Sequence, residues 1–309
     1  MQPLLVITGP TAVGKTALTI QLAKRLNGEV VSADSMQVYR GMDIGTAKPT
    51  AAERQGIPHH LIDIADPNEP YDVARFVSDA SAAIAGIAGR GKLPIVSGGT
   101  GLYISSLLSG AVFPAGTRDE EYRRTLDVYE KEFGADGLHA MLKAADPESA
   151  AAIHPNNLPR VKRALEFFHC TGEKFSAYRA GQQNAPSPYR ATILLLERPR
   201  QELYARIEQR VDQMLGHGLL GEVEGLLASG VSARANAMQG LGYKELVYYI
   251  RGRSTWGESV RLLKRNTRRY AKRQLTWWRR RKDIHPVPAG GSIEQVIQVF
   301  STDQGGIGT

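Results

Sequence analysis

The sequence lacks several features that would assign a protein to a class at once. It has a single cysteine, Cys170, among 309 residues, which excludes disulfides within the chain and thiolate zinc sites. It has no apolar run long enough to cross a membrane and no basic, cleavable leader at its start. Its seven histidines do not recur at metal-binding spacing. We therefore expect a cytoplasmic protein from a reducing compartment.

Acidic residues are missing from one long stretch near the C-terminus. The chain has 39 basic and 31 acidic residues, a formal net charge of +8, and no acidic residue lies between Glu258 and Asp283. Thr255 and Glu258 form a capping box that predicts the start of a helix there. Because a solvated helix normally mixes charges of both signs, this excess of basic residues predicts contact with a nucleic-acid backbone.

What the sequence does contain begins with a phosphate-binding loop. The pattern G-x-x-x-x-G-K-[ST] is matched by Gly9, Pro10, Thr11, Ala12, Val13, Gly14, Lys15 and Thr16. Residues 4–7 predict a buried strand before the loop, and the apolar spacing after it predicts a helix. In that setting backbone amides and the helix N-terminus hold an anion, Lys15 adds a charge and the Thr16 hydroxyl holds Mg²⁺. The loop predicts a di- or triphosphate site without naming the compound.

Alternating strands and helices predict a mostly parallel α/β sheet of the P-loop NTPase type, similar to nucleotide kinases. Further strands are expected at residues 29–34, 60–64, 93–97 and 192–196, with an edge strand at 283–287. Between the third and fourth of these the pattern becomes helical and charged. We therefore expect an α/β catalytic core made of residues 1–114 and 189–309, which includes the basic C-terminal helices, and a helical insertion domain made of residues 115–188.

Polar residues at the ends of the expected strands are candidates for the site. Asp34 ends the second strand, and ligands of open α/β sheets bind beyond the carboxyl ends of strands; a helix cap or a Mg²⁺ ligand is the alternative role. Residues 98–103 form a second Gly-rich corner, which suits an anion or a plain tight turn. Arg206 and Arg210 lie four apart on one helix face. Spacing alone leaves open whether they bind phosphate or whether Arg206 pairs with Glu202.

Together these segments resemble the tRNA dimethylallyltransferase (tRNA isopentenyltransferase) family of bacterial type. The matching segments are residues 9–16, 32–35, 39–49, 98–103, 160–163, 206–210, 240–244 and 271–277, in family order across nearly the whole chain. The run from Gly41 to Pro49 is the most specific of them. Pro159 stands where some members carry a tRNA-contacting glutamine. The sequence has no zinc-finger extension of the kind that eukaryotic relatives carry at the C-terminus.

The resemblance implies a reaction that suits these residues. Dimethylallyl diphosphate would donate its allyl group to N6 of adenosine 37, next to the anticodon of a tRNA, with Mg²⁺ as cofactor. The phosphate loop would hold the diphosphate, helped by Arg210 as the main arginine and by Arg206 as the second. Asp34 matches the general base, and Thr100 matches a residue that positions the reacting groups. The adenosine must be flipped out of its stack to reach such a site.

The same resemblance assigns a tRNA surface that draws on both expected domains. Its residues are Asp34, Ser35, Met36, Gln37, Thr100, Arg123, Arg160, Lys162, Arg163, Gln239, Gly240, Leu241, Gly242, Tyr243 and Lys244. We expect the enzyme to act as a monomer away from any membrane.

Three alternatives fit part of the sequence. A nucleoside or metabolite kinase shares the phosphate loop but leaves the basic C-terminal helix without a role. A non-catalytic RNA-binding regulator accounts for that helix but leaves Asp34 and Thr100 without one. A prenyltransferase that acts on free adenine nucleotides needs no long basic surface.

Overall fold

The chain folds into two compact units. The computed structural model describes residues 1–114, 116–183 and 186–305. One unit is formed by Met1–Leu108 and Pro188–Thr309, and the other by Ser109–Ser187. The first of these divisions falls directly after the helix that ends at Leu108. None of the helices in the described ranges combines the length and apolarity that a bilayer crossing requires.

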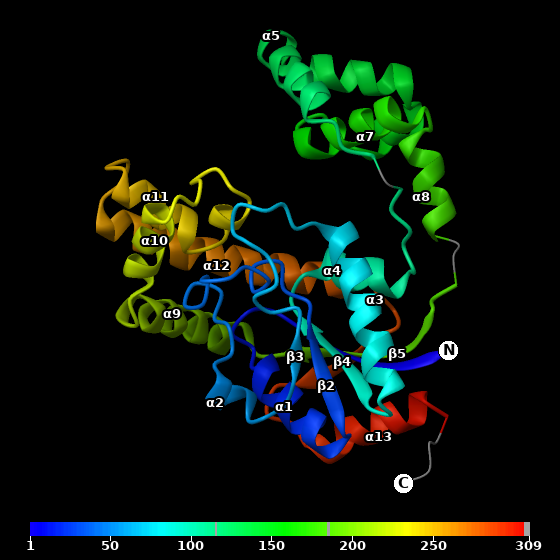
Figure 1. The fold of residues 1–309 in the computed structure, drawn as a ribbon, viewed down its shortest axis with the longest axis vertical. Coiled ribbons are helices and arrows are strands. Elements are labelled where there is room, and N and C mark those ends of the chain that lie inside the picture. Colours follow the sequence, from blue (N-terminus) through cyan, green and yellow to red (C-terminus); the bar gives the residue numbers. More distant parts are fainter. Residues whose placement is uncertain (115, 184–185, 306–309) are drawn as a thin grey trace. The chain divides into compact units, whose positions relative to one another are not determined.

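The larger unit is built on a six-stranded sheet in which every strand pair is parallel. The strand order is β3 (His59–His60), β2 (Gly28–Ser32), β4 (Leu93–Gly98), β1 (Gln2–Thr8), β5 (Tyr189–Glu197) and β6 (His285–Pro288) (Figure 1). The four strands that the apolar runs predicted at β1, β2, β4 and β5 are confirmed, as is the edge strand β6. Since neighbouring strands run in the same direction, the segments that follow β1, β2 and β4 meet at one edge of the sheet.

Helices cover both faces of this sheet. Leu4 and Val6 of β1 pack in one core cluster with α3 (Val73–Gly89) and α4 (Gly101–Leu108). Leu5 and Ile7 pack in a second cluster with α1 (Lys15–Arg25) and α13 (Ile293–Asp303). This alternation follows from the two-residue period of a strand. Four further helices extend these cores: α9 (Arg200–Gly216), α10 (Leu219–Ala228), α11 (Tyr243–Ile250) and α12 (Trp256–Trp278). This unit also has a short helix, α2 (Ala51–Arg54), and a 3-10 turn, η1 (Ala237–Gln239).

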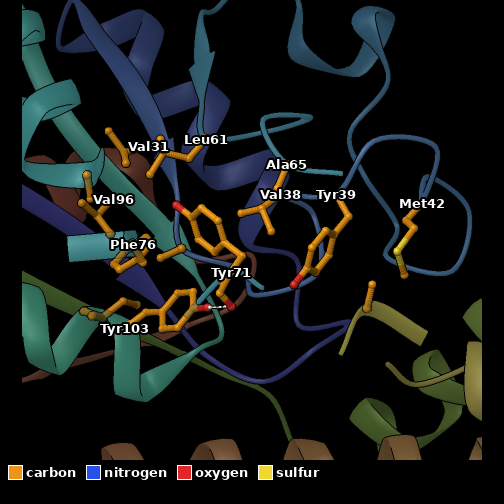
Figure 2. Close-up of a cluster of buried hydrophobic side chains, with 14 of the residues drawn as sticks. Val31, Val38, Tyr39, Met42, Leu61, Ala65, Tyr71, Phe76, Val96 and Tyr103 are labelled. Carbon is orange, nitrogen blue, oxygen red and sulfur yellow. Dashed lines mark hydrogen bonds between the residues drawn. The ribbon is translucent and has the colours of Figure 1, made fainter. Parts of the chain in front are cut away.

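A long segment without regular structure follows β2 and is packed firmly in place. Val38, Tyr39 and Met42 are fully buried and belong to the same core cluster as Val31 and Val96 of the sheet; in Figure 2, Val38 and Tyr39 lie between the sheet side chains and Met42. In the same cluster the rings of Phe76 and Tyr103 stack with centroids 4.4 Å apart. Burial of apolar side chains therefore holds residues 35–49 as an ordered loop without regular secondary structure.

The expected strand at residues 60–64 is wrong beyond its first residue. Leu61 and Asp63 have φ angles of +63° and +58°, which end the extended backbone of β3. The amides of Asp63 and Ile64 then donate to the carbonyls of Gln37 and Val38, at 3.2 Å and 2.8 Å. The apolar residues of this segment are therefore paired with the ordered loop and not with the sheet.

Every regular element in the described residues of the smaller unit is a helix. Its helices are α5 (Glu120–Ala145), α6 (Pro147–Ala152), α7 (Leu158–Thr171) and α8 (Phe175–Gln183). Leu126, Leu138, Val161 and Leu165 form the centre of its own core. The helix α5 is kinked at Gly134, whose φ of +71° is non-helical. A separate core of this kind is what allows the unit to be compact by itself.

Candidate active site

The phosphate loop connects β1 to α1, as its pattern predicts. Gly9 and Gly14 have φ angles of +147° and +110°, and a Cβ on Gly9 would lie 2.7 Å from the Leu196 carbonyl oxygen. Both positions therefore need glycine. Val13 is fully buried and anchors the loop in the core. The remaining predicted loop residues, Thr11, Ala12, Gly14, Lys15 and Thr16, line a cavity of about 720 Å³.

Three cations approach this loop. Lys15 Nζ donates to the carbonyls of Gly9 and Pro10, at 3.0 Å and 2.9 Å. Arg210 Nη1 donates to the Thr11 hydroxyl at 3.4 Å, and Arg206 Nε donates to the Ala12 carbonyl at 3.0 Å. The two arginines of α9 therefore both reach the loop.

The surface pairing of Arg206 with Glu202, which the sequence left open, does not occur. Glu202 instead pairs with Arg198 one turn earlier, and Arg198 Nε also donates to the Val13 carbonyl at 2.9 Å. Arg198 thus supports the loop from outside the cavity, and Arg206 remains available to the cavity that it lines.

The positive charge in this cavity is poorly compensated. Burial and the nearby Arg210 lower the pKa of Lys15 to about 8, while Asp34 opposes the change. Burial likewise lowers the pKa of Arg210. Within the described part of the chain, neither cation lies within 4.0 Å of a carboxylate oxygen. Recessed cations without paired carboxylates favour binding of an anion, because the anion supplies the missing partner.

Asp34 lies where β2 leaves the sheet and lines the same cavity. Its Oδ1 accepts hydrogen bonds from the amides of Met36 and Gln37, at 2.9 Å and 3.4 Å. These bonds resemble a cap and fix the carboxylate in place. No hydrogen bond to Oδ2 occurs in the described ranges, so one carboxylate oxygen can serve another partner. Thr100 lies close by and accepts a hydrogen bond from the Ser35 amide at 3.1 Å.

The helix α12 supplies two site residues that the sequence reasoning did not assign. Gln274 Oε1 accepts from the Thr11 amide at 2.9 Å, and its Nε2 donates to the Gly99 carbonyl at 2.9 Å. Tyr270, one turn earlier, lines the larger cavity, and burial raises the pKa of its hydroxyl while Thr100 and Gln274 partly oppose that change. Their four-residue spacing on an otherwise basic helix was a usable signal. The two Gly-rich corners are therefore joined by one side chain, Gln274.

A second cavity of about 290 Å³ adjoins the first. The two cavities share lining residues, which include Thr11, Asp34, Arg210 and Tyr270. The further walls of the second cavity include the predicted residues Ser35, Met36, Gln239, Gly240, Leu241, Tyr243 and Lys244. Gly242 does not line it; with φ at +94° it precedes α11. Gln37 lines the first cavity and also accepts from the Ser32 hydroxyl at 3.1 Å.

Four of the predicted tRNA-binding cations belong to the smaller unit. Arg123 forms two hydrogen bonds, of 2.7 Å and 3.0 Å, with the buried carboxylate of Glu166. Arg163 donates to the same carboxylate at 3.1 Å, and Lys162 pairs with acidic residues of α5. Arg160 is exposed and forms no ion pair in the described ranges. Three of the four cations thus have partners within the unit.

The basic face of α12 is only partly neutralised. Lys264 and Arg268 pair with Asp212 and Glu208 of α9. Arg261, Arg265, Arg269 and Lys272 recur every three or four positions, are exposed, and form no ion pair within the described residues. Part of the apparent charge excess is therefore compensated by another helix, and a stripe of free cations remains.

A phosphate loop at the carboxyl edge of a parallel sheet places this chain among the P-loop α/β proteins. The chain belongs to the IPP transferase family, whose family model matches residues 37–281. A further model, for isopentenyl transferase, matches residues 2–65. The resemblance inferred from the motifs is thereby confirmed.

Individual relatives cover nearly the whole chain. It is 50% identical over 283 residues to the tRNA dimethylallyltransferase of Geobacillus thermodenitrificans, covering 92% of this chain and 89% of the relative. The identity to the Bacillus subtilis protein of that name is also 50%, with 92% and 90% covered. The crystal structure of the tRNA isopentenylpyrophosphate transferase of Bacillus halodurans is 43% identical, with a TM-score of 0.74 and 98% of both chains covered. A eukaryotic dimethylallyltransferase acting on tRNA is 33% identical, with a TM-score of 0.82 over 98% of this chain and 78% of that one.

Proposed function

We propose that this protein transfers the dimethylallyl group of dimethylallyl diphosphate to N6 of adenosine 37 in tRNA and releases diphosphate. One observation carries the proposal: Asp34 lies in the wall shared by the anion-binding cavity and the adjoining cavity. A carboxylate at that junction suits removal of a proton from an adenine amine in one cavity as the amine attacks a diphosphate ester in the other. The names of the relatives agree with this reading.

The diphosphate would occupy the larger cavity. As the bond between the allyl carbon and the bridging oxygen breaks, negative charge grows on the leaving diphosphate. The loop amides, Lys15 and Arg210, which line this cavity, would stabilise that charge. Arg206 holds the loop through the Ala12 carbonyl and is the second arginine.

Mg²⁺ is the cofactor in this proposal, and the donors present fit it. The described residues contain no cluster of three His, Cys, Asp or Glu side chains that could hold a metal ion alone. The exposed Thr16 lines the larger cavity and would be the protein ligand, with diphosphate oxygens as the others. When bound, Mg²⁺ supplies charge neutralisation to the leaving group.

The adenine would enter the second cavity after flipping out of the anticodon loop. The N6 lone pair is delocalised into the ring, so the amine is a weak nucleophile. As N6 forms its bond to the allyl carbon, it would pass a proton to Asp34, whose Oδ1 is held by two amides. Thr100 fixes the neighbouring Ser35 amide and so positions this wall.

The tRNA would be held by surfaces of both units. We propose that the stripe of exposed cations on α12 contacts its backbone, and that the helical unit adds contacts through Arg160 and the partly exposed faces of Arg123, Lys162 and Arg163. We also propose that the enzyme is a monomer. It would act in the cytoplasm.

A single assay tests the proposal against its alternatives. The protein is incubated with labelled dimethylallyl diphosphate, Mg²⁺ and unmodified tRNA, and in parallel with AMP or ATP in place of tRNA. Label on tRNA alone is the expected result. Label on AMP would support the prenyltransferase of free nucleotides, and phosphate transfer from ATP would support a kinase; either outcome without labelled tRNA overturns the proposal.

A further inference from the structure

Glu222 of α10 accepts hydrogen bonds from four donors at once. Its Oε2 accepts from the amides of Asp43 and Ile44, at 2.9 Å and 2.7 Å. Its Oε1 accepts from the Gly45 amide at 3.1 Å and from the Tyr243 hydroxyl at 2.6 Å. A carboxylate has about four lone-pair sites, so this one is fully used. Glu222 is not part of any motif in the sequence.

The groups that Glu222 holds form one wall of the second cavity. Gly45, Thr46 and Ala47 line it from the ordered loop, and Tyr243 lines it from the start of α11. The loop lies directly on the Tyr243 ring, since a Cβ on Gly45 would be 2.5 Å from a ring carbon. Tyr243 is itself fully buried. A shift of the loop away from this ring would therefore change the shape of the cavity.

We propose that Glu222 is a positioning residue for the acceptor base. It joins residues 43–45 to Tyr243 and thereby fixes the width of the second cavity beside Asp34. The inference rests on the proposed function, in which that cavity takes the flipped adenine. Glu222 does not line either cavity and acts only through the groups it holds.

The loop has a second tie, which acts through other atoms. Lys48 is 8% exposed and donates to the Tyr39 carbonyl at 2.9 Å, and it pairs with the carboxylates of Asp43 and Asp63. Lys48 thus ties the loop to the segment after β3. Because Lys48 reaches Asp43 through its carboxylate and Glu222 holds the amides of residues 43–45, loss of the Glu222 carboxylate should release those amides locally and leave the rest of the loop in place.

The test compares Glu222→Gln with Glu224→Gln, an exposed residue of the same helix. Glutamine has one acceptor oxygen, so it cannot satisfy all four donors. We expect hydrogen exchange of the Asp43, Ile44 and Gly45 amides to rise about tenfold or more in E222Q and to stay unchanged in E224Q. Exchange in the phosphate loop should not change in either variant.

Steady-state kinetics give the second readout. In E222Q we expect kcat/KM for tRNA to fall by about tenfold, because a displaced wall misplaces the base. The dissociation constant of inorganic diphosphate should stay within about twofold, since Glu222 contacts no residue of the phosphate loop. A general loss of stability would instead weaken the binding of both tRNA and diphosphate and would speed hydrogen exchange throughout the larger unit. That result overturns the proposal.

Two further variants complete the test. Tyr243→Phe removes only the hydroxyl and should leave the three amides protected, whereas Glu222→Asp keeps a carboxylate and should protect them better than glutamine does. If E222Q does not fold, exchange in E222D decides in the same way. If hydrogen exchange at residues 43–45 is unchanged in E222Q, the inference is overturned, whatever the enzymatic activity of the variant. If exchange there is faster but even the unaltered protein labels no tRNA, only the proposed function is overturned.

Discussion

Lys15 shows how a single side chain carries the chemistry of the phosphate loop. Its ammonium group donates to two loop carbonyls and, in the part of the chain that the structure describes, forms no ion pair with a carboxylate. Burial and Arg210 bring its pKa down to about 8, close to physiological pH. A bound diphosphate would reverse that effect, because an opposite charge favours the charged form of the lysine. The loop should therefore take up protons when it binds its ligand.

A pH dependence follows from this lysine. Below about pH 8 Lys15 is charged and attracts diphosphate, and above that pH it becomes neutral. We expect the affinity for inorganic diphosphate, measured by calorimetry, to fall as pH rises from 7 to 9. The fall should be larger for the unaltered protein than for Lys15→Met, because the variant lacks the charge. Calorimetry in buffers of different ionisation enthalpy should show proton uptake near pH 8. Parallel pH curves for the two proteins would contradict this assignment.

Asp34 offers a sharper test of the reaction. Asp34→Ala should slow allyl transfer by roughly 10²-fold or more, since the proton acceptor is lost, and should leave tRNA binding nearly intact. Asp34→Asn keeps an oxygen that can accept from the Met36 and Gln37 amides but cannot take a proton. Both variants should be slow in single-turnover assays. If the asparagine variant retains normal turnover, Asp34 serves as a structural cap and not as the base.

At the scale of elements, the β3 edge of the sheet is held by a buried carboxylate on β2. Glu29 is 3% exposed and contacts His60 of β3 at 2.7 Å, Arg90 at 2.6 Å and Lys92 at 2.9 Å. Burial alone would raise its pKa, but hydrogen bonds from these three residues outweigh burial and lower the pKa to about 2. Glu29 thus joins β2, β3 and the turn after α3.

Replacement of this carboxylate should weaken the fold in a pH-dependent way. Glu29→Gln should lower the free energy of unfolding by about 1–3 kcal/mol at pH 7. Because the pKa is lowered in the folded state, the stabilisation is complete above the unfolded value of 4.5 and is lost as pH falls toward 2. Urea unfolding at pH 7 and at pH 3 should show a smaller difference from the unaltered protein at pH 3. A stability difference that does not depend on pH would contradict the ion-pair account. The control is Glu294→Gln, which removes a carboxylate from an exposed ion pair.

The elements also show what can be predicted from sequence. The phosphate loop, β1 and the capping box of α12 depend on neighbours within a few residues, and the patterns located all three. The strand expected at 60–64 failed because Asp63 and Ile64 pair with a loop more than twenty residues earlier, and such a contact overrides local preference. Gln274 joins the site through a hydrogen bond to Thr11. The spacing of Tyr270 and Gln274 indicates that they share a helix face, but it does not reveal a partner so distant in sequence, and Glu222 was missed for the same reason.

At the scale of the whole molecule, the basic residues fall into two groups, those paired with carboxylates and those without an ion pair in the described ranges. The chain carries a net charge of +8, yet many of its cations are neutralised, such as Lys264 by Asp212 and Arg123 by Glu166. The exposed cations without ion pairs in the described ranges include the α12 stripe. Since only uncompensated cations gain by releasing counterions from a nucleic acid, this stripe, and not the total charge, should determine the strength of tRNA binding.

The salt dependence of tRNA binding tests that distinction. Arg265→Ala combined with Arg269→Ala should weaken binding and should reduce the slope of log K against log salt by about 0.7–0.9 for each cation lost. Lys264→Ala, which removes a cation already paired with Asp212 at 2.7 Å, should leave the slope nearly unchanged. Filter binding between 50 and 300 mM salt, roughly the range in which such slopes are resolved, measures all three proteins. Equal slopes would show that tRNA does not contact this face of α12, and the nucleic-acid surface would then have to lie elsewhere on the chain.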